Sequence, residues 1–175
     1  MKALQFWKAV TQDKADFLGA LLHLFEEHAI RYCVIGGQGV NAYADPVVSL
    51  DLDLVVAADQ IAPLEALLRP GFKVKRFANS VNVSAEGSRL RVQIQTDPRY
   101  AAFVARASAR DVLDVTMPVA TVEDVLQGKV WAASDSTRRA SKRLKDLADI
   151  ARLLETRPEL RQRVPPEMLA RLSSE

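Results

Sequence analysis

Two aspartates, Asp51 and Asp53, have the type and spacing needed to bind a metal ion. They lie at alternate positions in the otherwise apolar residues 50–56, and this alternation predicts a strand with both carboxylates on one face and the leucines on the other. From the rise per residue of a strand, the two positions are about 7 Å apart along the chain. Carboxylates at this spacing can share a hard divalent cation, and Mg²⁺ or Mn²⁺ is the natural candidate.

A pair of glycines, Gly36 and Gly37, precedes this strand and suits the binding of phosphate. The apolar residues 32–35 predict a short buried strand that ends at the glycines, and residues 38–44 predict one or two helical turns after them. A turn without side chains lets backbone amides approach phosphate oxygens closely, and the following helix favours negative charge there. Phosphates held by the turn would meet a metal held by the aspartates.

Either motif alone is also compatible with a purely structural role. Strands with acidic outer faces are common, so Asp51 and Asp53 also fit the solvated edge of an unrelated α/β domain. The order and spacing of strand, glycine pair and aspartates favour the phosphate and metal site.

The rest of the sequence predicts a mixed sheet flanked by helices. Apolar residues at three- and four-residue spacing indicate helices, and short alternating segments bounded by turn residues indicate strands. The expected helices run from Thr11 or Asp13 to about His28 and over residues 59–68, 122–133, 137–154 and 166–172. Further strands are expected at residues 72–77, 80–84 and 89–95, with residues 111–115 and Val119 extended. The expected fold class is α/β, with a mixed central sheet and a C-terminal helical extension.

The length of 175 residues favours one compact domain. We expect residues 1–120 to form the α/β core and residues 121–175 to form a helical part packed on it. No apolar run approaches the roughly 18 residues needed to cross a bilayer, and the N-terminus lacks the layout of a signal peptide. A cytoplasmic protein without a membrane partner is therefore expected, and its single cysteine, Cys33, is expected to be a buried, inert thiol.

Four segments carry a resemblance to a known group of enzymes. Residues 34–37 and 49–54, which read Val-Ile-Gly-Gly and Ser-Leu-Asp-Leu-Asp-Leu, resemble the nucleotidyltransferase superfamily, which includes DNA polymerase beta. The chain is most similar to the small bacterial branch that contains nucleotidyltransferase-type toxins of abortive-infection toxin/antitoxin systems. Residues 122–129 and 142–149 are similar to the helical Lys and Lys-Asp-x-x-Asp elements of that branch.

This resemblance implies a central sheet of the nucleotidyltransferase type and a metal-dependent reaction. A nucleoside monophosphate would pass from a nucleoside triphosphate to an RNA, protein or small-molecule acceptor. Gly36, Gly37 and Ser49 would contact the triphosphate, and Lys129 and Lys145 would neutralise its charge.

The resemblance also implies a separately encoded antitoxin protein as a partner. The basic residues between positions 138 and 143 suit an RNA acceptor, because clustered cations attract a phosphate backbone. A solvated helix face with internal ion pairs is the alternative for that cluster. Tyr100 and Trp131 are candidates to stack on a base, with core packing as the alternative.

One carboxylate that the resemblance implies is missing. Superfamily members usually carry a third acid on a neighbouring strand, where it helps to bind the metal and can act as a base. Here Gln93 occupies that position, and a glutamine offers a carbonyl oxygen to a metal but no charge and no basic group. Asp97 and Glu86 are the acids near enough to substitute, although both also fit as turn residues. The alternative function is therefore a degenerate nucleotidyltransferase fold that binds a nucleotide, an RNA or a protein without catalysis.

Overall fold

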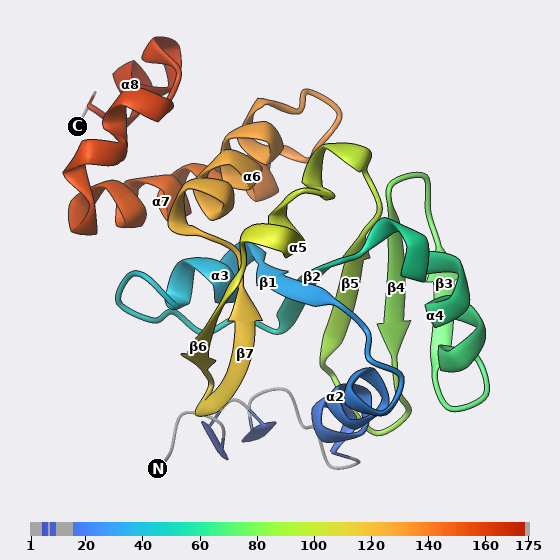
Figure 1. Cartoon of the computed structure of the whole chain (residues 1–175). Coiled ribbons are helices and arrows are strands. Elements are labelled where there is room, and N and C mark those ends of the chain that lie inside the picture. The colour runs from blue at the N-terminus through green and yellow to red at the C-terminus, as the bar shows by residue number, and fades with distance from the viewer. Residues whose placement is uncertain (1–4, 7, 10–15, 174–175) are drawn as a thin grey trace.

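A mixed sheet of seven strands forms the centre of the computed structural model, which describes residues 5–6, 8–9 and 16–173 (Figure 1). The strands are β1 (Tyr32–Ile35), β2 (Asp51–Val56), β3 (Lys73–Arg76), β4 (Ser80–Ser84), β5 (Arg91–Gln95), β6 (Ser108–Val112) and β7 (Val115–Val119). Their order across the sheet is β3-β4-β5-β2-β1-β7-β6. Strand β2 pairs with β1 in antiparallel and with β5 in parallel orientation, which confirms the mixed α/β sheet expected from the sequence.

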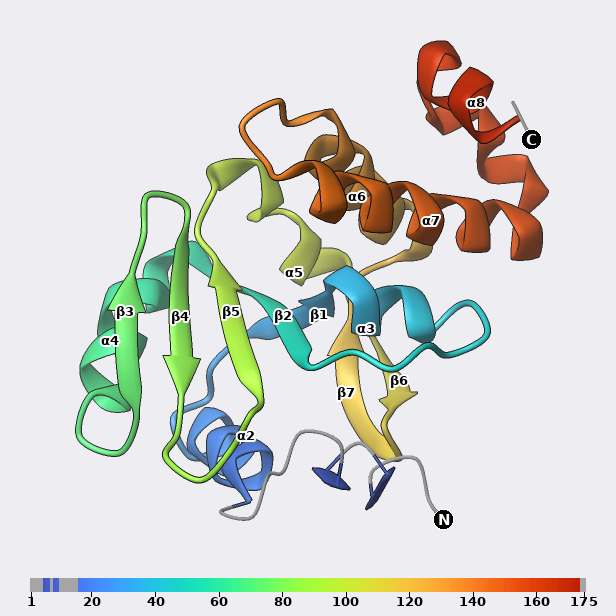
Figure 2. The ribbon, with the colours of Figure 1, turned by 180° about the vertical axis from the view of Figure 1, so that it is seen from behind.

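Helices cover both faces of this sheet. They are α2 (Phe17–Glu27), α3 (Gly36–Asn41), α4 (Ile61–Leu68), α5 (Phe103–Arg106), α6 (Val122–Ser134), α7 (Ala140–Thr156) and α8 (Pro166–Leu172), with 3-10 turns η1 (Ala58–Gln60), η2 (Pro98–Tyr100) and η3 (Pro158–Arg163). The view from behind shows α3, α6 and α7 on the face opposite to α2 and α4 (Figure 2). None of the helices in the described part of the chain is long and apolar enough to span a membrane.

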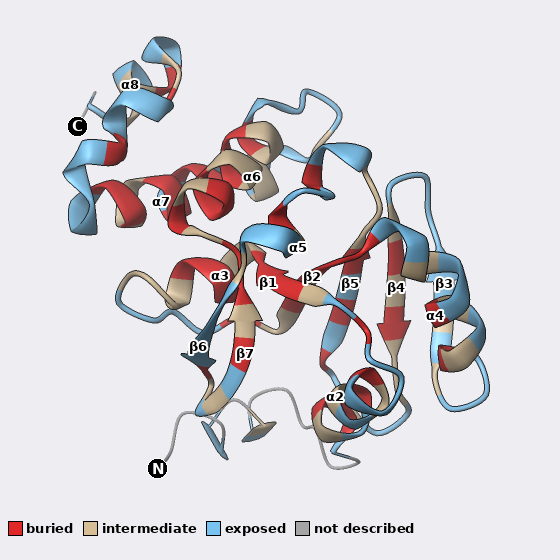
Figure 3. Cartoon of the chain, viewed as in Figure 1, coloured by how far each residue is buried: buried red, intermediate tan, exposed pale blue. Residues whose placement is uncertain are grey.

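The alternation along β2 sends its side chains to two faces of the sheet, each of which has its own apolar core. Leu52 and Leu54 are fully buried in the core beneath α2 and α4, whereas Val55 belongs to the core beneath α6 and α7 (Figure 3). Successive side chains of a strand point to opposite faces. Asp51 and Asp53 therefore point to the face that α3, α6 and α7 cover, as the alternation predicts.

The two glycines belong to helix α3 rather than to a separate turn before it. Gly36 begins the helix with a φ of 64°. A β-carbon at this position would lie 2.1 Å from Oδ2 of Asp53, so only glycine allows the chain to pass so close to that carboxylate. From the sequence, the helix was expected to begin at residue 38, after a separate turn, whereas it begins two residues earlier, at Gly36.

Two other element boundaries were predicted from the sequence; one differs in the structure, and the other lies outside the described residues. Residues 111–115 are not one extended segment, because Leu113 and Asp114 have φ angles of 57° and 62° and form the turn of the β6–β7 hairpin. The expected helix start at Thr11 or Asp13 lies outside the described residues, and α2 is described from Phe17 onward.

The C-terminal helices pack on the sheet through buried and charged contacts. Thr121 caps α6 by accepting a hydrogen bond from the backbone N–H of Asp124 at 3.2 Å. On α7, Arg152 donates to the side chain of Asn41 at 2.8 Å and to the backbone carbonyl of Asp45. These bonds connect α7 to the segment that leads from α3 into β2, while a domain boundary at Ala120 remains a prediction.

Candidate active site

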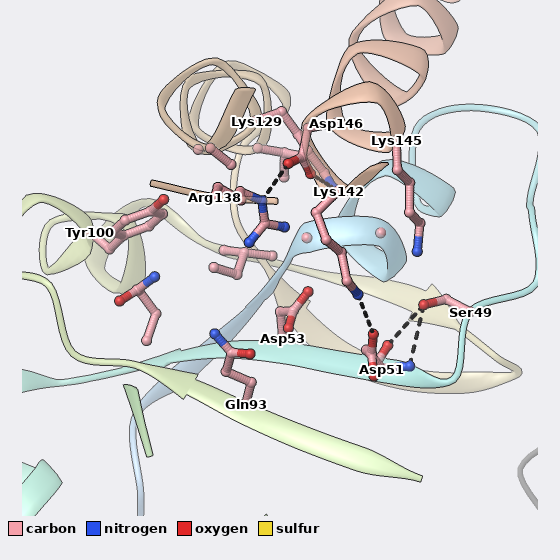
Figure 4. A pocket seen from close by; sticks show the side chains of 17 residues that line it. Ser49, Asp51, Asp53, Gln93, Tyr100, Lys129, Arg138, Lys142, Lys145 and Asp146 are labelled. Atoms are coloured by element: carbon pink, nitrogen blue, oxygen red, sulfur yellow. Dashed lines mark hydrogen bonds and ion pairs between the residues drawn. The ribbon is translucent and has the colours of Figure 1, made fainter. Parts of the chain in front are cut away.

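A cleft of about 190 Å³ lies between the sheet face that carries Asp51 and Asp53 and the helices α6 and α7 (Figure 4). It brings together the eight residues predicted to bind the metal or the triphosphate, which are Gly36, Gly37, Ser49, Asp51, Asp53, Gln93, Lys129 and Lys145. These residues come from α3, the loop before β2, the strands β2 and β5, and the helices α6 and α7. The cleft therefore collects the candidate phosphate- and metal-binding groups in one place.

Asp51 is held by a serine and by two cations. The backbone N–H of Asp51 donates to Oγ of Ser49 at 3.3 Å. Its Oδ1 lies 2.8 Å from Nε of Arg91, which is the residue directly beside it on β5, and its Oδ2 lies 3.9 Å from Nζ of Lys142. Both carboxylate oxygens thus face a positive charge.

Asp53 lies deeper, beside Gly36 and beneath the helices. Burial raises the pKa of the Asp53 carboxyl above its usual range, and the nearby carboxylate of Asp51 adds to this rise. The ammonium group of Lys129 opposes it. A cation placed between Asp51 and Asp53 would relieve the cost of keeping Asp53 ionised.

Gln93 occupies the register position opposite Asp53 on the parallel strand β5. Neither acid considered as a substitute reaches the cleft. The carboxylate of Asp97 accepts hydrogen bonds from Arg99, with Nη2 at 2.8 Å, and Glu86 is exposed in the turn before β5. The remaining acid of the lining, Asp146, is ion-paired with two cations.

The donors around Asp51 and Asp53 fit a hard divalent cation although they form a small set. Two carboxylates, the amide oxygen of Gln93 and the hydroxyl of Ser49 are all oxygen groups, which Mg²⁺ and Mn²⁺ prefer. No cluster of three or more His, Cys, Asp or Glu side chains suited to a metal occurs in the described part of the chain. Any cation in this cleft would therefore depend partly on oxygens of its ligand.

The two lysines predicted to neutralise phosphates have different surroundings. Lys145 is exposed at the mouth of the cleft, near Ser49 in Figure 4. The side chain of Lys129 is only 9% exposed, and its ammonium lies 3.0 Å from Asp146 and 2.7 Å from Asp149. Burial alone would lower the pKa of Lys129, but these two carboxylates outweigh it and raise the pKa.

Several residues of the lining were not assigned to the site from the sequence. Arg138 and Lys142 had been considered only as guides for RNA and Tyr100 only as a candidate to stack on a base, and Gln95 and Asp146 complete the polar lining. Tyr100 and Trp131 pack edge to face with ring centroids 5.1 Å apart, and only Tyr100 lines the cleft. A signal for Gln95 existed in the sequence, because it lies on the same strand face as Gln93.

The sheet order, the flanking helices and the cleft over two strand aspartates define an α/β fold of the nucleotidyltransferase class. The family model described as nucleotidyl transferase AbiEii toxin, Type IV TA system, matches residues 47–174. The chain belongs to this family. The match includes β2, β5, α6 and α7, whereas Gly36 and Gly37 lie before it.

Solved structures of nucleotidyltransferases share the fold at low sequence identity. The complex of ANT(2")-Ia with adenylyl-2"-tobramycin has a TM-score of 0.60 at 13% identity, over 89% of this chain and 97% of that one. Lincomycin-bound lincosamide antibiotic adenylyltransferase LnuA has a TM-score of 0.54 at 16% identity, over 78% and 95%. An antigenic nucleotidyltransferase-like protein from Paracoccidioides brasiliensis has a TM-score of 0.53 at 18% identity, over 95% and 85%. No curated protein matches the sequence.

Proposed function

We propose that the protein is a metal-dependent nucleotidyltransferase that transfers a nucleoside monophosphate from a nucleoside triphosphate to an RNA acceptor in the cytoplasm. The observation that carries this proposal is the placement of Asp51 and Asp53 on one strand face, within a cleft that also contains Ser49 and the exposed Lys145. Membership of the nucleotidyltransferase family supports the reaction class.

The phosphates are assigned to the end of the cleft near Ser49. There the backbone of Gly36 and Gly37 has no side chain to block a phosphate, and the hydroxyl of Ser49 and the ammonium groups of Lys142 and Lys145 can contact it. Lys129, already paired with two carboxylates, contributes by its charge and by holding α6 against α7. In the reaction, the acceptor hydroxyl oxygen bonds to the α-phosphorus, the bond to the bridging oxygen breaks, pyrophosphate leaves and the hydroxyl proton passes to water.

The metal ion, Mg²⁺ or Mn²⁺, is assigned to Asp51, Asp53 and the amide oxygen of Gln93. When bound, it would stabilise the negative charge that develops on the phosphates during transfer. Asp51 must exchange its contacts with Arg91 and Lys142 for the metal, which leaves Lys142 available to the phosphates.

The proposal also includes an RNA as the acceptor and an antitoxin protein as the partner. The RNA acceptor is supported by Arg138 and Lys142, which line the cleft, and by Arg139 and Arg143 beside them in the sequence, because clustered cations can attract a phosphate backbone. The toxin description of the family supports an activity that harms the cell and is held in check by a second protein.

Calorimetric titration with ATP, GTP, CTP and UTP, each with and without Mg²⁺, tests the nucleotide site. We expect metal-dependent binding that is lost in the double variant Asp51→Asn/Asp53→Asn. Incubation with the nucleotide labelled on its α-phosphate and with cellular RNA should then yield labelled RNA. If the folded wild-type protein binds no nucleotide, the proposed enzymatic function is wrong, and the alternative is a degenerate nucleotidyltransferase fold that binds RNA or protein without catalysis.

A further inference from the structure

The sheet face that carries Asp53 continues beyond the cleft over β5, β4 and β3, and this part is called the outer sheet face. In the register of the sheet, Gln93 on β5 lies opposite Asp53. Asn82 on β4 lies opposite Gln93, and Lys75 on β3 lies opposite Asn82. Because neighbouring strands are about 4.8 Å apart, this row of residues extends about 14 Å from Asp53 to the edge of the sheet.

No helix in the described part of the chain covers the outer sheet face. In Figure 2, α3, α6 and α7 lie toward the β1 side of the sheet, whereas β3, β4 and β5 are in front and α4 is behind them. The side chains agree with this arrangement, since Lys73, Lys75, Arg91 and Gln93 are all exposed. The outer sheet face is therefore accessible to a ligand.

The side chains of the outer sheet face are polar or positively charged. Lys73 and Lys75 flank Val74, which packs against the core beneath α2 and α4, so the two lysines point to the other face. On β4, the residues that alternate with buried valines are Ser80, Asn82 and Ser84. None of the three strands contains an acid.

The acids beside these strands leave an excess of positive charge on the outer sheet face. Glu65 belongs to α4, behind the sheet, and accepts a hydrogen bond from Arg76 at 3.1 Å. Asp97 follows β5 and is paired with Arg99. Glu86 is exposed in the turn between β4 and β5 and contributes one negative charge, against the two lysines of β3.

An exposed aromatic ring lies beside these lysines. Phe77 directly follows β3 and is 44% exposed. Nζ of Lys75 lies 5.0 Å from the centroid of its ring, so the ring and the ammonium group are on the same side of the sheet. The backbone N–H of Phe77 donates to the carbonyl of Ser80 at 2.8 Å, which fixes the backbone that carries the ring.

This combination of groups suits single-stranded nucleic acid. Ammonium groups bind phosphates, an aromatic ring stacks on an unpaired base, and amides and hydroxyls bond to sugars or base edges. A duplex could use the charges but not the ring, because its bases are already stacked on one another.

We infer that the outer sheet face, through Lys73, Lys75, Phe77 and Asn82, binds single-stranded RNA outside the catalytic cleft. This inference rests on the proposed function, which takes RNA as the acceptor. The RNA strand crosses the sheet from β3 toward β5, with its phosphates at the two lysines and one base on Phe77. Its binding here requires neither a metal ion nor a nucleoside triphosphate.

Fluorescence anisotropy tests this surface with a labelled, unstructured RNA of about 12 nucleotides, a length within the usual site sizes of single-strand binders. Measurement without Mg²⁺ or nucleotide reports on RNA binding alone. Lys73→Gln/Lys75→Gln removes two charges, and Phe77→Leu removes the aromatic ring. Arg161→Gln/Arg163→Gln removes two charges at exposed positions of η3, which leads into α8, far from β3 in Figure 2, and serves as the control.

The two variants should weaken binding in different ways. Without two phosphate contacts, the slope of log affinity against log salt concentration should become shallower by about 1.4, whereas the control should keep the slope of the wild type. Phe77→Leu should lower the affinity about fivefold or more at an unchanged slope, and Phe77→Tyr should retain the affinity. Binding of a duplex of the same sequence should not respond to Phe77→Leu.

Other results would overturn this inference. If Lys73→Gln/Lys75→Gln behaves like the control, the RNA binds elsewhere. If Phe77→Leu binds RNA as tightly as the wild type, the face is only a cationic surface and the assignment to a single strand is wrong.

Failure of the proposed function gives a different pattern. A wild type that binds no RNA but binds a triphosphate with Mg²⁺ refutes the RNA surface and leaves nucleotide transfer intact. RNA binding that depends on Lys73, Lys75 and Phe77, in a protein that binds no triphosphate, refutes the enzyme and supports the surface.

Discussion

Nε of Arg91 lies 2.8 Å from Oδ1 of Asp51, so the first proposed metal ligand is already neutralised by the residue directly beside it in the sheet. The side chain of Arg91 is 65% exposed, so its guanidinium can turn away from the cleft when a cation arrives. Metal binding at Asp51 would therefore compete with an internal ion pair.

Replacing Arg91 by glutamine should strengthen the binding of free divalent cations. An ion pair this exposed is worth up to about 1 kcal/mol, so the gain in Mn²⁺ affinity should not exceed about fivefold. Electron paramagnetic resonance of free Mn²⁺ measures this affinity without nucleotide. Arg89→Gln, an exposed position two residues earlier, is the matched control, and an equal gain in both variants would mean that only the net charge matters.

Gln93→Asp should restore a third carboxylate opposite Asp53. A further negative charge there favours a bound cation, and we expect Mn²⁺ affinity to rise about tenfold. The rate of pyrophosphate release should rise as well, since the new group can also accept a proton. Gln93→Asn retains the neutral amide as control. Unchanged metal affinity in Gln93→Asp would show that this position does not face the metal.

We expect Lys129 to have a mainly structural role and Lys145 to have a role in nucleotide binding. Lys129→Met leaves the buried carboxylates of Asp146 and Asp149 with only Arg138 and Arg152 as partners, and the free energy of unfolding should fall by about 3 kcal/mol. Lys145→Met should change it by less than about 0.5 kcal/mol because the residue is exposed, yet weaken nucleotide binding. Urea unfolding and calorimetry distinguish these effects. Equal stability of the two variants would contradict the assignment.

Cys33 should react with thiol reagents only after the protein unfolds. Its side chain is fully buried in the core beneath α6 and α7, and burial raises its pKa to about 12. The thiol therefore stays protonated and inaccessible between pH 7 and pH 9, and labelling by a chromogenic disulfide should be slow until urea is added. Because the sequence has one cysteine, complete labelling is one thiol per chain. Rapid labelling of the native protein would refute the buried position.

Periodicity in the sequence was sufficient to predict most of the fold. The alternation in residues 50–56 predicted both the strand β2 and the face on which Asp51 and Asp53 lie, because one side of that strand is apolar. The hairpin turn at Leu113 and Asp114 was missed, because neither residue is a glycine or asparagine that would signal left-handed backbone.

The candidate site was less accessible to sequence reasoning where it depends on long-range contacts. The residues expected in the site do converge on one cleft, but the pairing of Lys129 with Asp146 and Asp149 follows from the packing of α6 against α7 and not from a local pattern. The position of Arg91 beside Asp51 likewise depends on the register between β2 and β5. The two residues are 40 positions apart in the sequence, so no local pattern predicts their hydrogen bond.

Gly36 also constrains how this protein can evolve. A side chain at that position would be strained by the positive φ and would displace the carboxylate of Asp53. A single nucleotide change in its codon would therefore abolish the proposed activity while sparing both apolar cores. If cells are selected against the proposed activity, the survivors should carry such changes among their inactivating mutations, and the variant protein should still fold.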